Sequence, residues 1–168
     1  MPKVGIVMGS ISDLEVVKGA KKVLEGFGVE VEMRVLSAHR TPVEVVRYAQ
    51  DAARNGIEVL IAAAGKAAHL PGVLAAYTTL PVIGLPVKSS TLDGLDSLLS
   101  IVQMPSGVPV ATVSINGSEN AALLAVQMLA LRYGYLADKL EEYRQRMAQQ
   151  VLDQDQKLQE ELVCSEKA

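Results

Sequence analysis

Short apolar runs of strand length alternate along this chain with longer segments of helical periodicity. The first run, 4–8, is almost entirely apolar and ends at Gly9, which is typical of a strand buried on both faces of a parallel sheet. The second run alternates apolar and charged residues, so one face of that strand should be less covered. Strands separated by helices need right-handed crossovers, so the alternation predicts an α/β domain with a parallel sheet. The expected strands are 4–8, 29–36, 59–64, 82–85 and 109–114.

Two capping-box patterns indicate where helices should begin. Ser12 is followed three positions later by Glu15, and Thr41 is followed in the same way by Glu44, with a proline at the first helical position in the second case. These side chains can bond the backbone amides that the first turn of a helix leaves without partners. The expected helices are 13–27, 42–54, a short one through 75 and 76, 94–102 and 119–133.

The chain changes character beyond Tyr133. Apolar residues in 134–162 mostly follow helical spacing and the residues between them are charged or Gln, which predicts an amphipathic helix of about four to seven turns. The α/β domain, 1–133, is complete without it, so we interpret this helix as an arm that lies on a neighbouring subunit. A surface helix packed on its own domain is the alternative. Residues 163–168 are expected to form a disordered polar tail.

Charge and cysteine content exclude several functions. The net charge is -3, so a basic surface for nucleic acid is not expected. Cys164 is the only cysteine, so no disulfide can form within the chain. Apolar stretches fall short of the roughly 20 residues that span a bilayer, and the N-terminal run is shorter than the apolar region of a signal peptide. We therefore expect a soluble, cytoplasmic protein with no membrane partner.

The turn after the first strand offers hydroxyl groups and helix N-terminal amides. Gly9 is followed by Ser10, Ser12 and Asp13, and such a turn can bind a phosphate or the hydroxyl groups of a sugar. The turn has neither the glycine fingerprint of dinucleotide sites nor the lysine of nucleoside triphosphate loops. Ser12 and Asp13 could equally be plain helix-capping residues.

The turn after the second strand places His39 beside Arg40. An imidazole titrates near neutral pH and suits proton transfer, whereas a guanidinium is a rigid fork for phosphate or carboxylate. Loops that follow strands are where open α/β sheets bind ligands. The alternative is that His39 is a solvated or structural residue.

The loop after the third strand contains His69 among glycines and alanines, whose small size lets the backbone approach a ligand closely. His69 could take part in catalysis or simply bond its own loop. Two histidines without clustered cysteines or carboxylates make a poor metal site, so we expect no metal and no cofactor. The polar loops 88–90 and 106–107 could add amides and hydroxyls but are not specific.

Several motifs, in order and at matching spacing, resemble the bacterial class I N5-carboxyaminoimidazole ribonucleotide mutases of purine biosynthesis. The resemblance covers essentially all of 4–133. It rests on Gly-Ser at 9–10, Ser-Asp at 12–13, Ser-Ala-His-Arg-Thr-Pro at 37–42, Ala-Ala-His-Leu-Pro-Gly at 67–72, the segment 94–105, and Gly-Val-Pro-Val-Ala-Thr-Val at 107–113.

This resemblance implies a flavodoxin-like three-layer domain, 1–133, that is catalytic and assembles as an octamer. It also implies that a carboxylate moves from N5 to C4 of an aminoimidazole ribonucleotide without metal, ATP or cofactor. His39 would be the acid–base residue, and Ser10, Asp13 and Arg40 would bind the ribose and phosphate. The substrate-binding residues implied are Ser10, Ser12, Asp13, Ser37, Ala38, Arg40, Gly65, Ala68, His69 and Leu70.

The chain departs from the family pattern at Ala63 and Lys66, where family members have glycine. If the glycine at the second position has positive φ, Lys66 would strain the loop by about 1 kcal/mol or more. Two other functions remain open. One is direct carboxylation of aminoimidazole ribonucleotide by CO2, as in class II enzymes, although those have lysine in place of Arg40. The other is a ribotide-binding module without catalysis.

Overall fold

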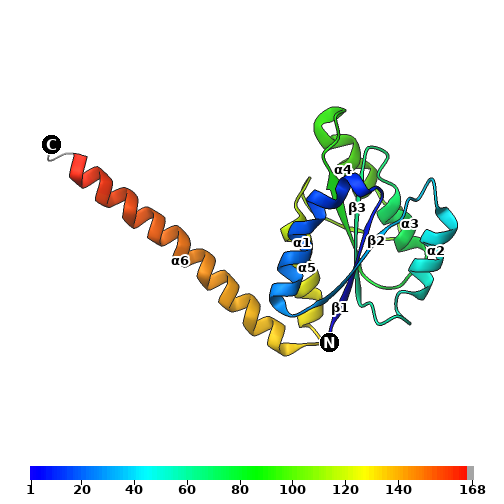
Figure 1. Cartoon of the computed structure of the whole chain (residues 1–168), viewed down its shortest axis with the longest axis horizontal. Coiled ribbons are helices and arrows are strands. Elements are labelled where there is room, and N and C mark those ends of the chain that lie inside the picture. Colours follow the sequence, from blue (N-terminus) through cyan, green and yellow to red (C-terminus); the bar gives the residue numbers. More distant parts are fainter. Residues whose placement is uncertain (166–168) are drawn as a thin grey trace.

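A five-stranded parallel sheet forms the centre of the computed structural model, which describes residues 1–165 (Figure 1). The strand order is β2-β1-β3-β4-β5, which is the order of flavodoxin-like domains, so the predicted fold class is confirmed. The order reverses direction at β1, between its neighbours β2 and β3. The strands are β1 (Lys3–Met8), β2 (Glu30–Val35), β3 (Val59–Gly65), β4 (Val82–Val87) and β5 (Ala111–Thr112).

Helices cover both faces of this sheet. α1 and α5 pack on one face and α2 and α3 on the other, giving three layers (Figure 1). The helices are α1 (Leu14–Phe27), α2 (Pro42–Asp51), α3 (Leu70–Ala76), α4 (Leu95–Val102), α5 (Ser118–Ala130) and α6 (Gly134–Ser165), and short 3-10 turns, η1 (Ile11–Asp13) and η2 (Leu92–Gly94), precede α1 and α4. No helix within residues 1–165 is both long and apolar enough to cross a membrane.

The core consists of two apolar clusters, one on each face of the sheet. Successive residues of β3 alternate between them, so Ile61 faces α1 and α5 while Leu60 faces α2 and α3, and both are fully buried. Each such side chain contributes about 1.5–3 kcal/mol on burial. Gly5 fits this packing because a Cβ atom there would lie 2.7 Å from the Tyr48 hydroxyl and 2.8 Å from Leu60 Cδ2. β2 lies at the edge of the sheet and is more exposed than β1, as its alternating sequence predicted.

α1 begins at Leu14, close to its predicted start, but the capping box lies two residues before the predicted one, at the 3-10 turn η1. Ser10, rather than Ser12, is the capping residue: its Oγ accepts the Ser12 amide at 3.3 Å, and Asp13 Oδ2 accepts the Ser10 amide at 3.2 Å. The prediction of a Ser12–Glu15 box is therefore wrong. Two overlapping pairs could form a capping box, Ser10 with Asp13 and Ser12 with Glu15. Only Ser10 and Asp13 make both reciprocal bonds, so the turn η1 lies between the cap and α1.

The second predicted capping box is also wrong. The Thr41 hydroxyl donates to the Ser37 carbonyl at 3.2 Å and accepts the Ser37 amide at 2.9 Å, so it closes the preceding turn. α2 ends at Asp51, three residues before the predicted end. β5 contains only Ala111–Thr112, because its neighbour Pro109 has no amide to donate to the sheet.

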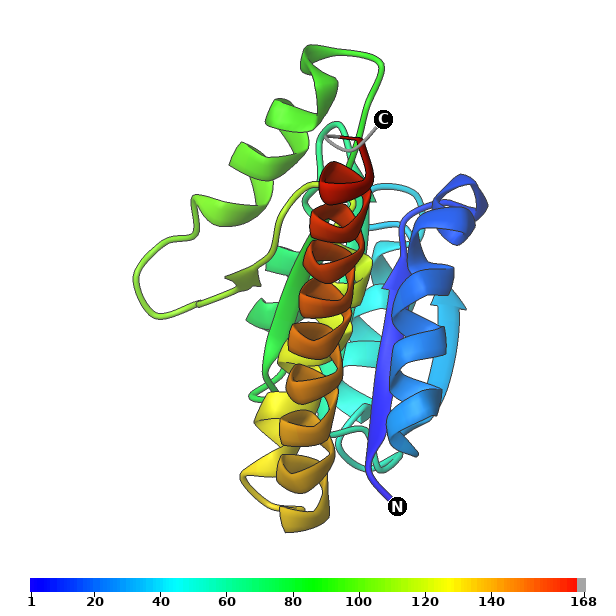
Figure 2. The same cartoon turned by 90° about the vertical axis from the view of Figure 1, so that its left-hand side faces the viewer.

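Helix α6 is longer than predicted, with 32 residues, and spans about 48 Å. Its first turns pack on the domain through the fully buried Leu136 and through Tyr143, whose ring lies 5.8 Å from that of Phe27. The rest projects away from the domain (Figures 1 and 2). A helix packed along its whole length on its own domain is therefore excluded. The helix continues to Ser165, so 163–165 do not form the expected tail, while 166–168 lie outside the described residues.

Candidate active site

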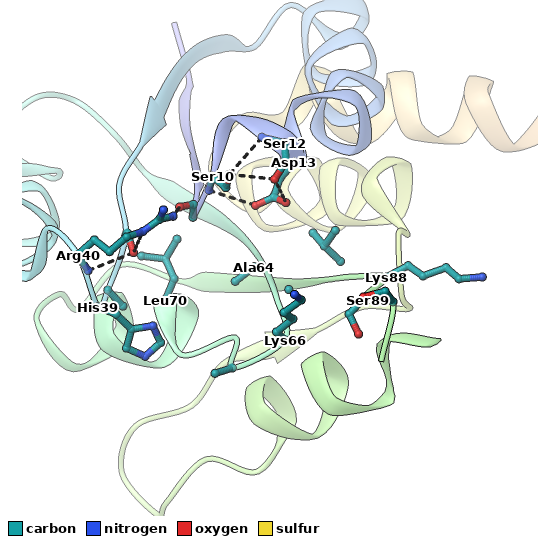
Figure 3. A pocket seen from close by; sticks show the side chains of 17 residues that line it. Ser10, Ser12, Asp13, His39, Arg40, Ala64, Lys66, Leu70, Lys88 and Ser89 are labelled. Atoms are coloured by element: carbon teal, nitrogen blue, oxygen red, sulfur yellow. Dashed lines mark hydrogen bonds between the residues drawn. The ribbon is translucent and has the colours of Figure 1, made fainter. Parts of the chain in front are cut away.

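Loops that follow four neighbouring strands meet at the carboxyl edge of the sheet, where the strand order reverses, and enclose a pocket of about 630 Å³ (Figure 3). This is where open α/β sheets bind ligands, and the volume is ordinary for a small-molecule site. The lining residues are Gly9, Ser10, Ser12, Asp13, Ser37, Ala38, His39, Arg40, Ala64, Gly65, Lys66, Ala67, Leu70, Val87, Lys88, Ser89 and Ser90.

The structure brings nearly all of the predicted site residues into this pocket. Two predicted residues lie elsewhere. Ala68 is fully buried in the core beneath the loop, and His69 is exposed at the edge of the site, where it contacts His39. The predicted residues that line the pocket are Ser10, Ser12, Asp13, Ser37, Ala38, His39, Arg40, Gly65 and Leu70.

The turn after β1 holds a compact group of polar side chains. The Ser12 hydroxyl lies 2.9 Å from Ser10 Oγ and 3.4 Å from Asp13 Oδ1. Asp13 is only 8% exposed, and this burial raises its pKa above the usual 3.8, although hydrogen bonds from the Ser10 amide and the Ser12 hydroxyl oppose the rise. Ser10 and Asp13 thus cap the turn and line the pocket at once.

Arg40 reaches from the turn after β2 to the turn after β1. One guanidinium nitrogen donates to the Gly9 carbonyl at 3.0 Å, and Nε lies 3.4 Å from Ser37 Oγ, which also accepts the Arg40 amide at 3.2 Å. A guanidinium has five N–H donors, so these bonds orient the group and leave others for a ligand. Arg40 is consequently held in place beside the hydroxyl groups of Ser10 and Ser12 (Figure 3).

The two histidines lie in direct contact. His39 Nε2 is 2.9 Å from His69 Nδ1, and the ring planes meet at 75°. Only one proton can occupy this hydrogen bond, so at least one of the two rings must be neutral. The imidazole of His69 therefore bonds the loop after β2 rather than its own loop. The contact joins residues 30 positions apart, which periodicity could not predict.

A buried hydroxyl fixes the loop after β3. Ser97, near the start of α4, is fully buried; its Oγ accepts the Lys66 amide at 2.8 Å and donates to the Val87 carbonyl at 2.9 Å. Lys66 has a φ of 57°, which confirms that the second departure from the family pattern falls at a position of positive φ. This conformation costs a residue with a side chain about 1–2 kcal/mol.

The loop after β4 adds residues that the sequence marked only as polar. Lys88, Ser89 and Ser90 line the pocket, whereas the other polar loop, 106–107, does not. The Ser89 hydroxyl is 2.9 Å from Asp96 Oδ1, and Lys88 Nζ pairs with Asp93 Oδ1 at 3.1 Å. A signal for them existed, because residues directly after a strand of a parallel sheet lie at its carboxyl edge.

The charges of the pocket favour an anionic ligand. Among the described lining residues, Arg40, Lys66 and Lys88 are cationic, and Asp13 is the one carboxylate. The bonded imidazoles of His39 and His69 can move a proton at one end of this cationic surface. Among the side chains that the structure describes, those of residues 1–162, no three His, Cys, Asp or Glu are grouped to hold a metal ion. The arrangement can thus bind an anion and transfer a proton beside it.

Comparison with known proteins identifies a family model, curated relatives and a solved structure that are similar to this chain. Residues 3–150 match the family model described as AIR carboxylase. The N5-carboxyaminoimidazole ribonucleotide mutase of Thermotoga maritima is 57% identical over 160 residues, covering 95% of this chain and 94% of the relative. The mutase of the same name from Pyrococcus abyssi is 63% identical over 147 residues, covering 88% and 84%. The crystal structure of Treponema denticola PurE superimposes with a TM-score of 0.86 at 32% identity, covering 94% of this chain and 99% of the other.

Proposed function

This chain belongs to the AIR carboxylase family, and on that premise we propose that it catalyses the N5-carboxyaminoimidazole ribonucleotide mutase reaction of purine biosynthesis. The enzyme is then an isomerase that converts N5-carboxyaminoimidazole ribonucleotide (N5-CAIR) into 4-carboxy-5-aminoimidazole ribonucleotide (CAIR). The observation that carries this proposal is the 57% identity to a mutase along almost the whole of both chains. The site supports it, since a ribonucleotide is an anion that fits a cationic pocket at a sheet edge.

The phosphate and ribose bind at the end of the pocket formed by the turns after β1 and β2. Arg40 is already oriented there by the Gly9 carbonyl, and the hydroxyls of Ser10 and Ser12 lie beside it. A guanidinium fork and hydroxyl donors are suited to phosphate oxygens. Asp13 lines the same end, where its carboxylate oxygens can accept hydrogen bonds from ribose hydroxyls.

His39 moves the proton. When the bond between N5 and the carboxyl carbon breaks, CO2 departs without the bonding electrons and the nitrogen takes a proton from the imidazole. C4 of the ring then attacks CO2, and the proton on C4 returns to His39, so atoms and charge balance. The 2.9 Å contact supports this assignment, since His69 orients the ring and fixes which nitrogen shares its proton.

CO2 stays in the site between the two steps. Small apolar side chains of Ala64, Ala67 and Leu70 line the part of the pocket next to the histidines. Such walls do not hydrogen-bond to water, so the freed CO2 remains near C4 instead of becoming hydrated. The Ser97 bond to the Lys66 amide keeps this loop in place.

A direct assay tests the proposed reaction. Purified protein is given N5-CAIR without bicarbonate, and separately aminoimidazole ribonucleotide (AIR) with bicarbonate, and the formation of CAIR is followed in both. We expect rapid conversion of N5-CAIR. The family description favours direct carboxylation as the second candidate, and turnover restricted to AIR with bicarbonate would establish it in place of the mutase reaction.

We also propose that the chain assembles as an octamer in the cytoplasm, with α6 lying on a second copy. The projecting part of α6 leaves Met147, Val151, Leu158 and Leu162 about half exposed or more, and such a stripe is stabilised by burial against another surface. Light scattering should give a mass eight times the 17.9 kDa of one chain. A monomeric mass at micromolar concentration would refute this assembly.

A further inference from the structure

Lys66 keeps a side chain at a backbone position that favours glycine. Its φ of 57° lies in the left-handed region, and its amide is fixed there by the buried hydroxyl of Ser97 at 2.8 Å. Residues with a Cβ atom persist in this region where the surrounding structure imposes the conformation, and such residues are frequent at ligand sites. The strain therefore directs attention to what the lysine side chain does.

The ammonium group of Lys66 differs from the other pocket cations because, in the part of the chain that the structure describes, no ion pair or hydrogen bond occupies it. Arg40 is bonded to the Gly9 carbonyl, and Lys88 is paired with Asp93 at 3.1 Å. Among the described side chains, those of residues 1–162, Lys66 Nζ has neither an acidic partner within 4.0 Å nor a hydrogen-bond acceptor, and Figure 3 shows the side chain inside the pocket. An unpaired cation in a concave site attracts an anionic group of the ligand.

The position of Lys66 in the chain indicates which anionic group of the substrate it binds. The substrate has two, the phosphate and the carboxylate. Lys66 lies on the same loop as His69, which contacts His39, and it is next to the apolar wall residue Ala67. Arg40 follows His39 in the chain, but its guanidinium donates to the Gly9 carbonyl in the turn after β1, where the phosphate is placed. The lysine and the imidazole that bonds the acid–base residue thus come from one loop, which points to the carboxyl group that leaves and returns beside His39.

We propose that Lys66 binds the carboxylate that is transferred and thereby selects carboxylated ribonucleotides over AIR. This inference rests on the proposed mutase function. An ammonium ion attracts a carboxylate but has much less attraction for neutral CO2, so Lys66 stabilises bound N5-CAIR and CAIR more than the state in which CO2 is free. An interaction of that kind lowers KM and leaves kcat unchanged or slightly reduced.

The test compares ligand affinities of matched variants by calorimetry. Lys66→Gln removes the charge and keeps a polar side chain that is one bond shorter, and Lys66→Arg keeps the charge. For Lys66→Gln we expect CAIR to bind roughly tenfold more weakly, AIR to bind within about twofold of wild type, and KM for N5-CAIR to rise with kcat unchanged. Lys66→Arg should restore most of the selectivity. Lys88→Gln is the control, since it removes a cation that is already paired with Asp93 and should change the binding of CAIR and AIR to the same small extent.

Several results would overturn the inference. Equal weakening of CAIR and AIR in Lys66→Gln, or no change in either, refutes carboxylate binding. A fall in kcat at constant KM would mean that Lys66 acts in the chemical step. Failure of the proposed function is seen separately, because wild-type protein would then bind CAIR with the same selectivity over AIR but not convert N5-CAIR. Wild-type protein that binds neither ribonucleotide would refute both.

Discussion

The buried hydroxyl of Ser97 links the loops after β3 and β4, and its removal tests how firmly the site is held. Ser97→Ala deletes one acceptor for the Lys66 amide and one donor to the Val87 carbonyl, at 2.8 and 2.9 Å. A buried polar group left without a partner costs about 1–3 kcal/mol. Lys66 is exposed to water but Val87 is only 8% exposed, so we expect a loss of about 2 kcal/mol in the free energy of unfolding.

Urea denaturation measures this loss as a lower midpoint with an unchanged slope. Ser100→Ala is the matched control, because the Ser100 hydroxyl lies on the same helix and bonds only the Asp96 carbonyl one turn earlier, at 2.7 Å. That variant should lose about 0.5 kcal/mol or less. Equal losses in the two variants would show that the Ser97 hydroxyl does not hold the loops together.

The same substitution should reduce activity beyond its effect on folding. A loosened Lys66 loop positions His69 less well against His39, which the wild type holds at 2.9 Å. A misplacement of about 1 Å can cost about a hundredfold in rate, and we expect a decrease of about tenfold at a temperature where the variant is fully folded. Ser97→Thr is the control because it retains the hydroxyl, and its turnover should stay closer to that of the wild type. Unimpaired turnover in Ser97→Ala would refute a role of the Ser97 hydroxyl in positioning His69.

Three further predictions follow from individual residues. His39→Asn should lower turnover at least roughly a hundredfold while CAIR binding measured by calorimetry persists, and unchanged turnover would refute the acid–base role. Lys66→Gly should raise the free energy of unfolding by about 0.5–1 kcal/mol in urea titrations, because glycine adopts the φ of 57° without strain; a loss of stability would contradict this. The raised pKa of Asp13 means that its contribution to stability is full below pH 3.8 and is lost as the pH rises through the folded-state value. The free energy of unfolding of wild type relative to Asp13→Asn should therefore fall between pH 4 and pH 7. A rise over that range would mean that folding lowers the pKa of Asp13.

The strands that position the site were predictable because burial on both faces leaves a continuous apolar run. β1 and β3 show this directly, and the residues after them, from Ser10 and from Gly65, were correctly expected at one edge. The length of β5 was overestimated, since the apolar segment 109–114 is longer than the two residues that pair with β4 in the described structure. Local apolar pattern thus identifies a central strand better than a strand at the edge of a sheet.

Side-chain partners were predicted less well than elements. The sequence around Thr41 matches a helix-capping pattern, but its hydroxyl instead closes a turn with Ser37. Ser10, and not Ser12, is the residue that caps the first helical turn. Ser97 had no signal at all, because a single serine in an amphipathic helix does not reveal that tertiary structure buries it. The His39–His69 contact depends on where two strands place their loops, which is a property of the assembled sheet.

The place of β1 between β2 and β3 also sets the order in which this site can form. The loops that contain His39 and His69 follow strands that do not pair with each other, so their contact reaches across the end of β1. During synthesis, β1 emerges first but must wait for residues 59–63 before its second side is paired. Such long-range parallel pairing is slow compared with helix formation. The imidazole pair is therefore expected to assemble late in folding, which makes the appearance of activity during refolding a kinetic marker for closure of the sheet centre.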